Sequence, residues 1–236
     1  MGTDIHIAVE EQMDDGTWRI VKPPYRSRWD DGYSWSPWAE SNDFDDPRPD
    51  PTVRNYAAFA FLADVRNGYG FAGVITHEPV EAQFPNRGLP EDSPFYATGE
   101  VDDHSWLGDH SFTWATLEEL LNAPWEVEFK QRGVVGYRGY REWKEKGLPT
   151  SWSGDVCGPG VTIHPLEKFE QLYSDAQASG YDALAEQVGS GDYTTVEWVW
   201  QPIANCSFRK WVRWLRDDYL ADRDPRKVRV LMGFDS

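Results

Sequence analysis

Apolar and polar side chains alternate at the start of the chain. Residues 4–12 (DIHIAVEEQ) place isoleucine and valine on one side and mostly polar residues on the other. This is the period of a half-buried β-strand. The turn sequence Asp14, Asp15 and Gly16 follows, and the alternation resumes at residues 17–21. The two segments therefore predict a β-hairpin.

Further strand-like and helix-like segments follow in no regular order. Alternation, or β-branched and aromatic content, predicts strands at residues 126–131, 193–200 and 228–234. Capping residues and apolar periodicity predict helices at residues 53–66, 116–122, 165–180 and 204–221, with a shorter helical stretch at 140–146. Because no strand–helix unit recurs with a fixed period, the pattern favours an α+β fold with an antiparallel or mixed sheet and three to four helices.

The sequence shows no linker, so we expect a single domain over residues 1–236. Residues 23–53 are rich in proline, aspartate, serine, tryptophan and glycine. This composition predicts a long irregular insertion or lid.

Charge and composition exclude several kinds of partner. The net charge is −17, which argues against non-specific binding to nucleic acid or to anionic membranes, because both depend on neutralising phosphates. No apolar run is long enough to span a membrane, and the first residues lack the pattern of a signal peptide. Cys157 and Cys206 lie far apart and predict no disulfide framework. We therefore expect a soluble cytoplasmic protein.

The triplet Asp-His-Ser occurs twice within ten residues, as Asp103-His104-Ser105 and Asp109-His110-Ser111. No lysine or arginine occurs between residues 88 and 129. Imidazoles beside carboxylates can hold a metal, move a proton or grip a polar ligand. The spacing of six between the histidines fits no standard metal motif, and neighbouring acids favour the protonated rings. The repeat therefore favours a polar recognition loop, although capped turns with local hydrogen bonds explain it equally well.

Asp4 and His6 form a second cluster, because residues two apart share a face of a strand. A solvent-exposed strand face is the plainer explanation. If His6 lies close to His104 or His110 in the folded protein, we expect the two clusters to form one functional site. A divalent metal, if one binds, would take its ligands from both clusters, namely Asp4, His6, Asp103, His104, Asp109 and His110.

Arginine, asparagine and tryptophan suggest a site for an anionic ligand. Arg54, Asn55 and Arg66 belong to the predicted helix region, and arginine forks bind carboxylate or phosphate. Ion pairs within the fold are the alternative that the sequence favours for them. Trp35 and Trp38, with other aromatics of the 23–53 segment, provide stacking surfaces typical of a nucleotide clamp or of a loop anchored to the body.

Five blocks carry a family resemblance. They are MGTDIH at residues 1–6, RNYxxFAxLAxVRN at 54–67, RGLPxD at 87–92, the histidine and TLEEL region at 104–120, and VRVxxGFD at 228–235. Together they resemble a group of phage and bacterial proteins of uncharacterised activity. The resemblance covers the first and last fifths and the middle third of the chain, but not residues 145–190. It implies a phage or bacterial cytoplasmic origin, in the host cytoplasm for a phage protein, where such proteins are often counter-defence factors.

Three functions follow as hypotheses. The favoured one is a protein that binds a small anionic, nucleotide-like ligand, in a phage context sequestering a host defence signal. Its predicted contacts are His6, Arg54, Asn55, Arg66, Arg87, His104, Ser105, His110, Trp35 and Trp38. The second is a metal-dependent or acid–base hydrolase that uses the Asp and His clusters. The third is an acidic surface that inhibits another protein. Oligomeric state, ligand identity and catalysis are left open by the sequence.

Overall fold

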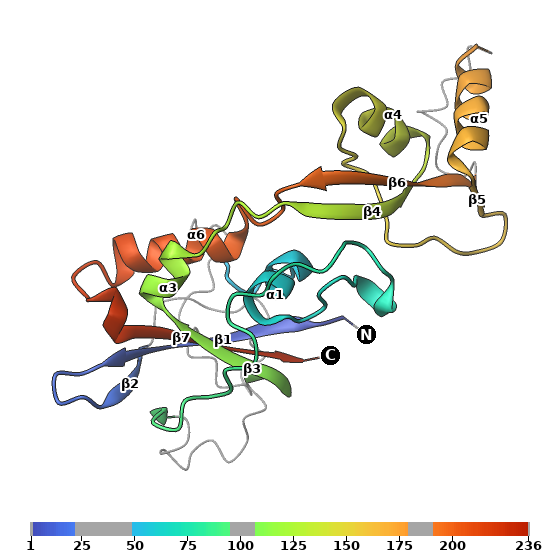
Figure 1. The fold of residues 1–236 in the computed structure, drawn as a ribbon. Coiled ribbons are helices and arrows are strands. Elements are labelled where there is room, and N and C mark those ends of the chain that lie inside the picture. Colours follow the sequence, from blue (N-terminus) through green and yellow to red (C-terminus); the bar gives the residue numbers. More distant parts are fainter. Residues whose placement is uncertain (1, 22–48, 95–106, 179–190, 236) are drawn as a thin grey trace, which may run out of the picture. The chain divides into compact units, whose positions relative to one another are not determined.

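The structure is a computed structural model that describes residues 2–21, 49–94, 107–178 and 191–235 (Figure 1). The strands are β1 (Asp4–Gln12), β2 (Trp18–Val21), β3 (His110–Thr116), β4 (Phe129–Val135), β5 (Thr162–His164), β6 (Asp192–Trp200) and β7 (Val228–Asp235). The α-helices are α1 (Tyr56–Ala63), α3 (Leu117–Asn122), α4 (Tyr137–Lys146), α5 (Leu166–Ala178) and α6 (Ser207–Trp214). Short helical segments are η1 (Phe71–Gly73), η3 (Leu215–Tyr219) and η4 (Pro225–Lys227). The predicted α+β class is confirmed, with one α-helix more in these residues than the three to four expected.

The chain forms two compact units. Unit 1 comprises residues 1–67, 80–127 and 202–236, and unit 2 comprises residues 68–79 and 128–201. The expectation of a single domain stays a prediction. The predicted insertion or lid at residues 23–53 lies almost wholly outside the described residues.

Unit 1 is built on a four-stranded antiparallel sheet with the order β2-β1-β7-β3. The predicted hairpin is confirmed, because β1 pairs with β2 around the turn at residues 14–16. β7 pairs with β1 on one side and with β3 on the other, and every residue of β7 except Asp235 is buried. The first and last described strands are therefore neighbours.

Helix α1 packs against one face of this sheet. The rings of Phe59 in α1 and Phe234 in β7 lie 5.3 Å apart. Asn55 caps the start of the helix by accepting a hydrogen bond from the backbone N–H of Ala58, at 3.1 Å. The helix ends at Ala63 because Asp64 adopts the left-handed conformation. The sequence predicted a helix to residue 66.

The opposite face of the sheet carries a buried ion pair. The Nε of Arg229 donates to Glu10 at 2.6 Å, and its Nη1 donates to Asp92 at 2.8 Å. The guanidinium also lies 3.8 Å from the centre of the Trp18 ring. Charges buried in this way must be paired, so these contacts fix the 87–92 turn to the sheet.

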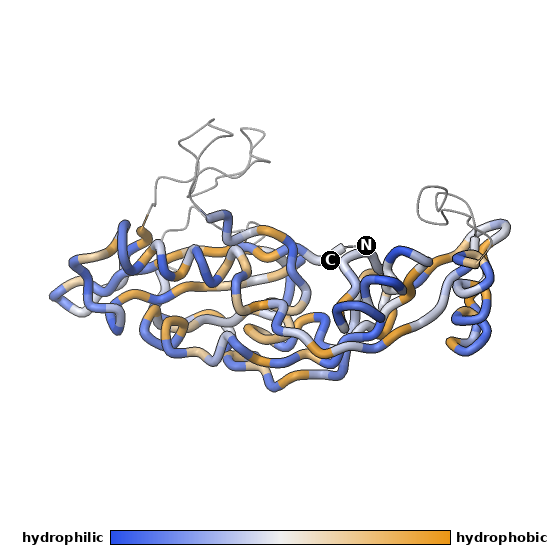
Figure 2. Tube along the Cα trace, turned by 90° about the horizontal axis from the view of Figure 1, so that it is seen from above, coloured by the Kyte–Doolittle hydropathy of each residue, from blue (hydrophilic) through white to orange (hydrophobic). Residues whose placement is uncertain are grey.

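Unit 2 contains the sheet β4-β6-β5, in which β4 is antiparallel and β5 parallel to β6. Tyr140 from α4 and Phe169 from α5 pack together with Trp198 of β6 in an aromatic core. Figure 2 shows mixed hydrophilic and hydrophobic residues along α5, in which Phe169 is the buried side chain. Much of the aromatic content therefore closes a core, as expected for large rings.

Other element boundaries also differ from the predictions. β4 begins at Phe129 and not at residue 126, because Trp125 is buried against Phe61 and its Nε1 donates to the carbonyl of Leu120 at 2.8 Å. α4 covers Tyr137–Lys146, longer than the stretch expected at 140–146. Within the described ranges, no helix has the length and apolar character needed to cross a membrane.

Candidate functional site

A β-bulge opens strand β3. His110 pairs with Phe234 of β7, whereas Thr113 pairs with Met232, so β3 has one residue more than its partner over this stretch. Ser111 lies in the bulge and has a φ of 54°. Bulges of this kind turn side chains away from the regular ladder and are frequent beside functional sites. The bulge therefore sets the directions of the His110 and Ser111 side chains.

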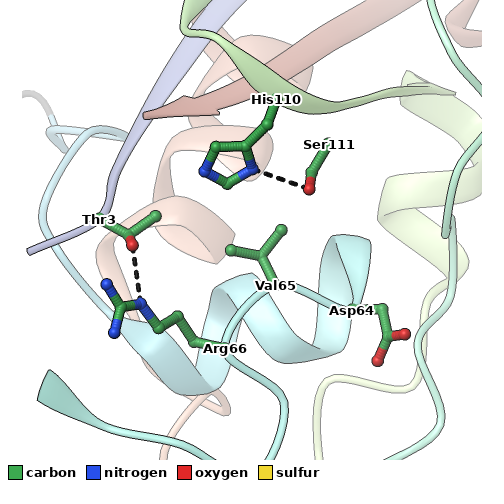
Figure 3. A pocket seen from close by; sticks show the side chains of 6 residues that line it. All are labelled: Thr3, Asp64, Val65, Arg66, His110 and Ser111. Atoms are coloured by element: carbon green, nitrogen blue, oxygen red, sulfur yellow. Dashed lines mark hydrogen bonds between the residues drawn. The ribbon is translucent and has the colours of Figure 1, made fainter. Parts of the chain in front are cut away.

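The bulge borders a pocket of about 320 Å³ in unit 1 (Figure 3). Its lining comes from three places in the sequence: the residue before β1, the end of α1 and the start of β3. The lining residues are Thr3, Asp64, Val65, Arg66, His110 and Ser111. The pocket is shallow and open to solvent, so a small ligand here would stay partly exposed.

The pocket lining has an unusual backbone. Asp64 has a φ of 63° and Arg66 a φ of 57°, in addition to Ser111. Five non-glycine residues of the described chain have positive φ, and three of them line this pocket. Such conformations each cost on the order of 1–3 kcal/mol and cluster at functional sites. The clustering marks this pocket as the strongest site candidate in unit 1.

Hydrogen bonds orient the polar groups of the pocket. The Nε of Arg66 donates to the hydroxyl of Thr3 at 2.7 Å, and its guanidinium lies 5.4 Å from the centre of the Tyr56 ring. The Nδ1 of His110 is 2.9 Å from the hydroxyl of Ser111. The His110 ring also stacks on Phe234, with 6.4 Å between ring centres. The site thus presents a guanidinium, an imidazole and two hydroxyls on supported side chains (Figure 3).

His6 does not join His110. Directly opposed residues of a sheet share a face, so His110 lies on the face of Phe234 and Ile5, and His6 lies on the other face. The Nε2 of His6 is 2.9 Å from Asp235 Oδ2. Burial acts to raise the pKa of Asp235, but the hydrogen bonds from His6 and from the backbone N–H of Asp4 outweigh it, so the pKa lies below its usual value.

The other candidate residues outside the pocket have partners within the fold. Arg54 donates to both carboxylate oxygens of Asp4, at 2.8 and 2.6 Å. Arg87 donates to both carboxylate oxygens of Glu119, at 2.9 and 3.1 Å, and also stacks on aromatic rings. Asn55 caps α1. These three residues hold together the strands and helices around the pocket, and they do not line it.

The described part of the chain gives no support to the metal hypothesis. No group of three or more histidine, cysteine, aspartate and glutamate side chains suited to a metal occurs there. Asp109 Oδ1 lies 3.8 Å from the Nε2 of His110. Five candidates fall outside the described residues, namely Trp35, Trp38, Asp103, His104 and Ser105.

Sequence reasoning named His110 and Arg66 but missed four residues of the lining. Thr3, Asp64, Val65 and Ser111 were not among the predicted contacts. Asp64 carried a weak signal, because aspartate is one of the few residues that accept a left-handed conformation at a helix end. Thr3 carried none, since its place depends on how β1 approaches the end of α1.

Comparisons with protein-family models, with curated proteins and with solved structures found no match. The case for function therefore rests on the geometry of the pocket.

Proposed function

We propose that this protein binds a small anionic ligand in the pocket beside the β3 bulge. The observation that carries the proposal is that Arg66, His110 and the hydroxyls of Thr3 and Ser111 line one open pocket. Guanidinium, imidazole and hydroxyl groups all donate hydrogen bonds, and charge-assisted bonds to phosphate or carboxylate are the strongest of these.

Asp64 suggests that the ligand also carries hydroxyl or amino groups. Its carboxylate lies at the other end of the pocket from the Arg66 guanidinium (Figure 3), and it accepts a hydrogen bond from Asn67 at 2.7 Å. A carboxylate repels an anionic group but accepts hydrogen bonds from sugar hydroxyls, as in dinucleotide-binding sites. A phosphate near Arg66 and a ribose near Asp64 would satisfy both ends. This division supports a nucleotide-like ligand.

The overall charge makes such a site selective. With a net charge of −17, the protein as a whole repels anions at long range. Binding must therefore come from short-range contacts in the pocket. Because the sequence resembles phage proteins, we propose that the ligand is a host defence signal and that the protein sequesters it.

Isothermal titration calorimetry tests the proposal, with inorganic phosphate, ribose 5-phosphate and a panel of linear and cyclic nucleotides. We expect at least one phosphorylated compound to bind, and Arg66→Gln to weaken it about 10- to 100-fold, because a hydrogen bond to a charged group contributes about 1.5–3 kcal/mol. Arg226→Gln is the matched control, since Arg226 lies in the same unit, pairs with Asp224 and does not line the pocket.

A second variant separates the two ends of the pocket. Asp64→Asn should weaken ribose 5-phosphate more than inorganic phosphate, because only the sugar reaches Asp64. Circular dichroism of each variant shows whether the fold is kept. The proposal is wrong if no compound of the panel binds at high protein concentration, or if the folded Arg66→Gln and Arg226→Gln variants bind equally well.

A further inference from the structure

We propose that Ser111 is a nucleophile in this pocket and that His110 is its general base, in the hydrolysis of small carboxylic esters that carry an anionic group. The inference rests on the proposed function for recognition of the anionic group. It adds a covalent step that binding alone does not need. The hydroxyl and the imidazole come from adjacent residues of the β3 bulge, and both line the pocket.

The distance between the two groups suits proton transfer. The Nδ1 of His110 lies 2.9 Å from the Oγ of Ser111 (Figure 3). A serine hydroxyl is a weak nucleophile on its own and is activated by an adjacent base within hydrogen-bond reach. The His110 side chain is 37% exposed, so protons can exchange with solvent.

The surroundings favour the tautomer that this role requires. Asp109 Oδ1 is 3.8 Å from the Nε2 of His110, too far for a hydrogen bond. Its negative charge still favours a proton on Nε2, which leaves Nδ1 free to accept the proton of Ser111. Stacking on Phe234 holds the ring in place.

The backbone conformation of Ser111 also supports its role as a nucleophile. A φ of 54° is uncommon for a serine. In α/β-hydrolases the nucleophilic serine sits on a sharp, strained turn that exposes its hydroxyl. In β3 the bulge does this, because Ser111 stands between the paired residues His110 and Thr113 and is not itself paired with β7 in the described register.

The proposed reaction has two halves. The Oγ of Ser111 attacks the carbonyl carbon of the ester while its proton passes to the Nδ1 of His110. The bond from that carbon to the alcohol oxygen then breaks, and the alcohol leaves with the proton from His110. Water next attacks the acyl-serine and gives a proton to His110, the bond from the carbon to Oγ breaks, and Oγ recovers that proton. Arg66 lines the same pocket beside Thr3 (Figure 3) and holds the anionic group of the ester during both halves.

A fluorophosphonate probe tests the nucleophile directly, because it marks activated serines covalently. The full-length protein is incubated with the probe and the modified residue is identified by peptide mass spectrometry. We expect Ser111 to be modified. His110→Gln should slow the reaction about 100-fold, the usual contribution of a general base.

The control variants separate loss of the hydroxyl from loss of the fold. Ser111→Gly removes the hydroxyl and suits the positive φ, and it should abolish labelling. Ser151→Ala, at an exposed serine of unit 2, should leave labelling unchanged. The nucleophile is disproved if the folded protein stays unlabelled, if another serine reacts in place of Ser111, or if His110→Gln reacts at the same rate. Phosphate or nucleotide binding that persists without labelling would overturn only this step and leave the proposed function standing.

Discussion

Three residues that line the pocket have a backbone conformation that glycine adopts more easily. Asp64, Arg66 and Ser111 all have positive φ, and an L-residue there costs about 1–2 kcal/mol. Glycine at these positions would remove that cost but would also remove a carboxylate, a guanidinium and a hydroxyl from the pocket. The local conformation therefore favours glycine, whereas the proposed chemistry requires the side chains. Residues that serve function at the expense of stability show this conflict.

Replacing Ser111 by glycine should stabilise the protein. We expect Ser111→Gly to raise the free energy of unfolding by about 0.5–1 kcal/mol, because relief of the positive φ exceeds the entropy that glycine adds to the unfolded chain. Urea denaturation measures this change. Asn86→Gly is the control: Asn86 has a φ of 54° outside the pocket, and its gain should be smaller because asparagine tolerates this region. A lower unfolding free energy for Ser111→Gly would contradict the strain argument.

At the scale of single residues, the sequence predicted some of the side chains that line the pocket. The second Asp-His-Ser triplet lies at the bulge, and His110 and Arg66 were predicted contacts. The predicted helix runs to residue 66, whereas α1 ends at Ala63, so a helix face does not explain the position of Arg66. Periodicity records which residues share a helix face, but not where a left-handed residue ends the helix. The meeting of Thr3 with Arg66 depends on that ending and was not predictable.

Two of the helix caps of unit 1 show what the local sequence reveals about the helices. The helix predicted at residues 116–122 begins with a capping box: the Oγ1 of Thr116 accepts from the N–H of Glu119 at 3.1 Å, and Glu119 accepts from the N–H of Thr116 at 2.8 Å. Asn55, a predicted ligand contact, caps α1. The capping box has a reciprocal signature at fixed spacing. A lone asparagine before a helix has no such signature.

Removing the α1 cap should destabilise the protein without touching the pocket. We expect Asn55→Ala to lower the free energy of unfolding by about 1 kcal/mol, because the N–H of Ala58 loses its acceptor. Asn55→Asp should keep most of the stability, since aspartate caps equally well. Thermal unfolding measures both variants, and calorimetry should show unchanged ligand affinity in each. A tenfold loss of affinity in the folded Asn55→Asp variant would instead make Asn55 a ligand contact.

At the scale of the whole molecule, the pH dependence of stability includes one buried histidine of unit 2. His77 is 4% exposed. Its Nε2 accepts from the N–H of Gly68 at 3.3 Å, and its Nδ1 donates to the carbonyl of Glu78 at 2.9 Å. Burial lowers the pKa of His77, and the hydrogen bond to Glu78 opposes this only in part. The folded protein therefore holds the imidazole neutral.

Mild acid should weaken the fold through this group. The pKa of His77 is lower in the folded chain than its ordinary value of 6.5, so stability is complete above pH 6.5 and falls as pH drops toward the lowered pKa. Protonation would place an N–H on Nε2 of His77, facing the N–H of Gly68, so the hydrogen bond between them would be lost. We expect this to lower the free energy of unfolding by about 1–3 kcal/mol. Urea denaturation at pH 7.5 and 5.5 measures the fall. His77→Gln, less stable at both values, should show a smaller difference between them. An equal difference in the two proteins would rule out His77 as the cause.

The sequence predicted the class of the whole molecule but not its two units. Strands 4–12 and 228–234 were each recognised by composition and alternation, and both exist as β1 and β7. Unit 2 combines residues 68–79 with residues 128–201, and no stretch rich in proline or glycine marks its limits uniquely. Patterns along a chain record the period of each segment. They do not record which distant segments pack together.

The place of β7 also bears on how unit 1 is made in the cell. β7 is synthesised after the other described strands, yet it stands between β1 and β3 in the sheet. Until it leaves the ribosome, both neighbours present unpaired backbone groups, and such edges recruit strands from other chains. The sheet of unit 1 is therefore complete only after β7 (Val228–Asp235) has been synthesised. Before then, the edges of β1 and β3 that face β7 are open to pairing with strands of other chains.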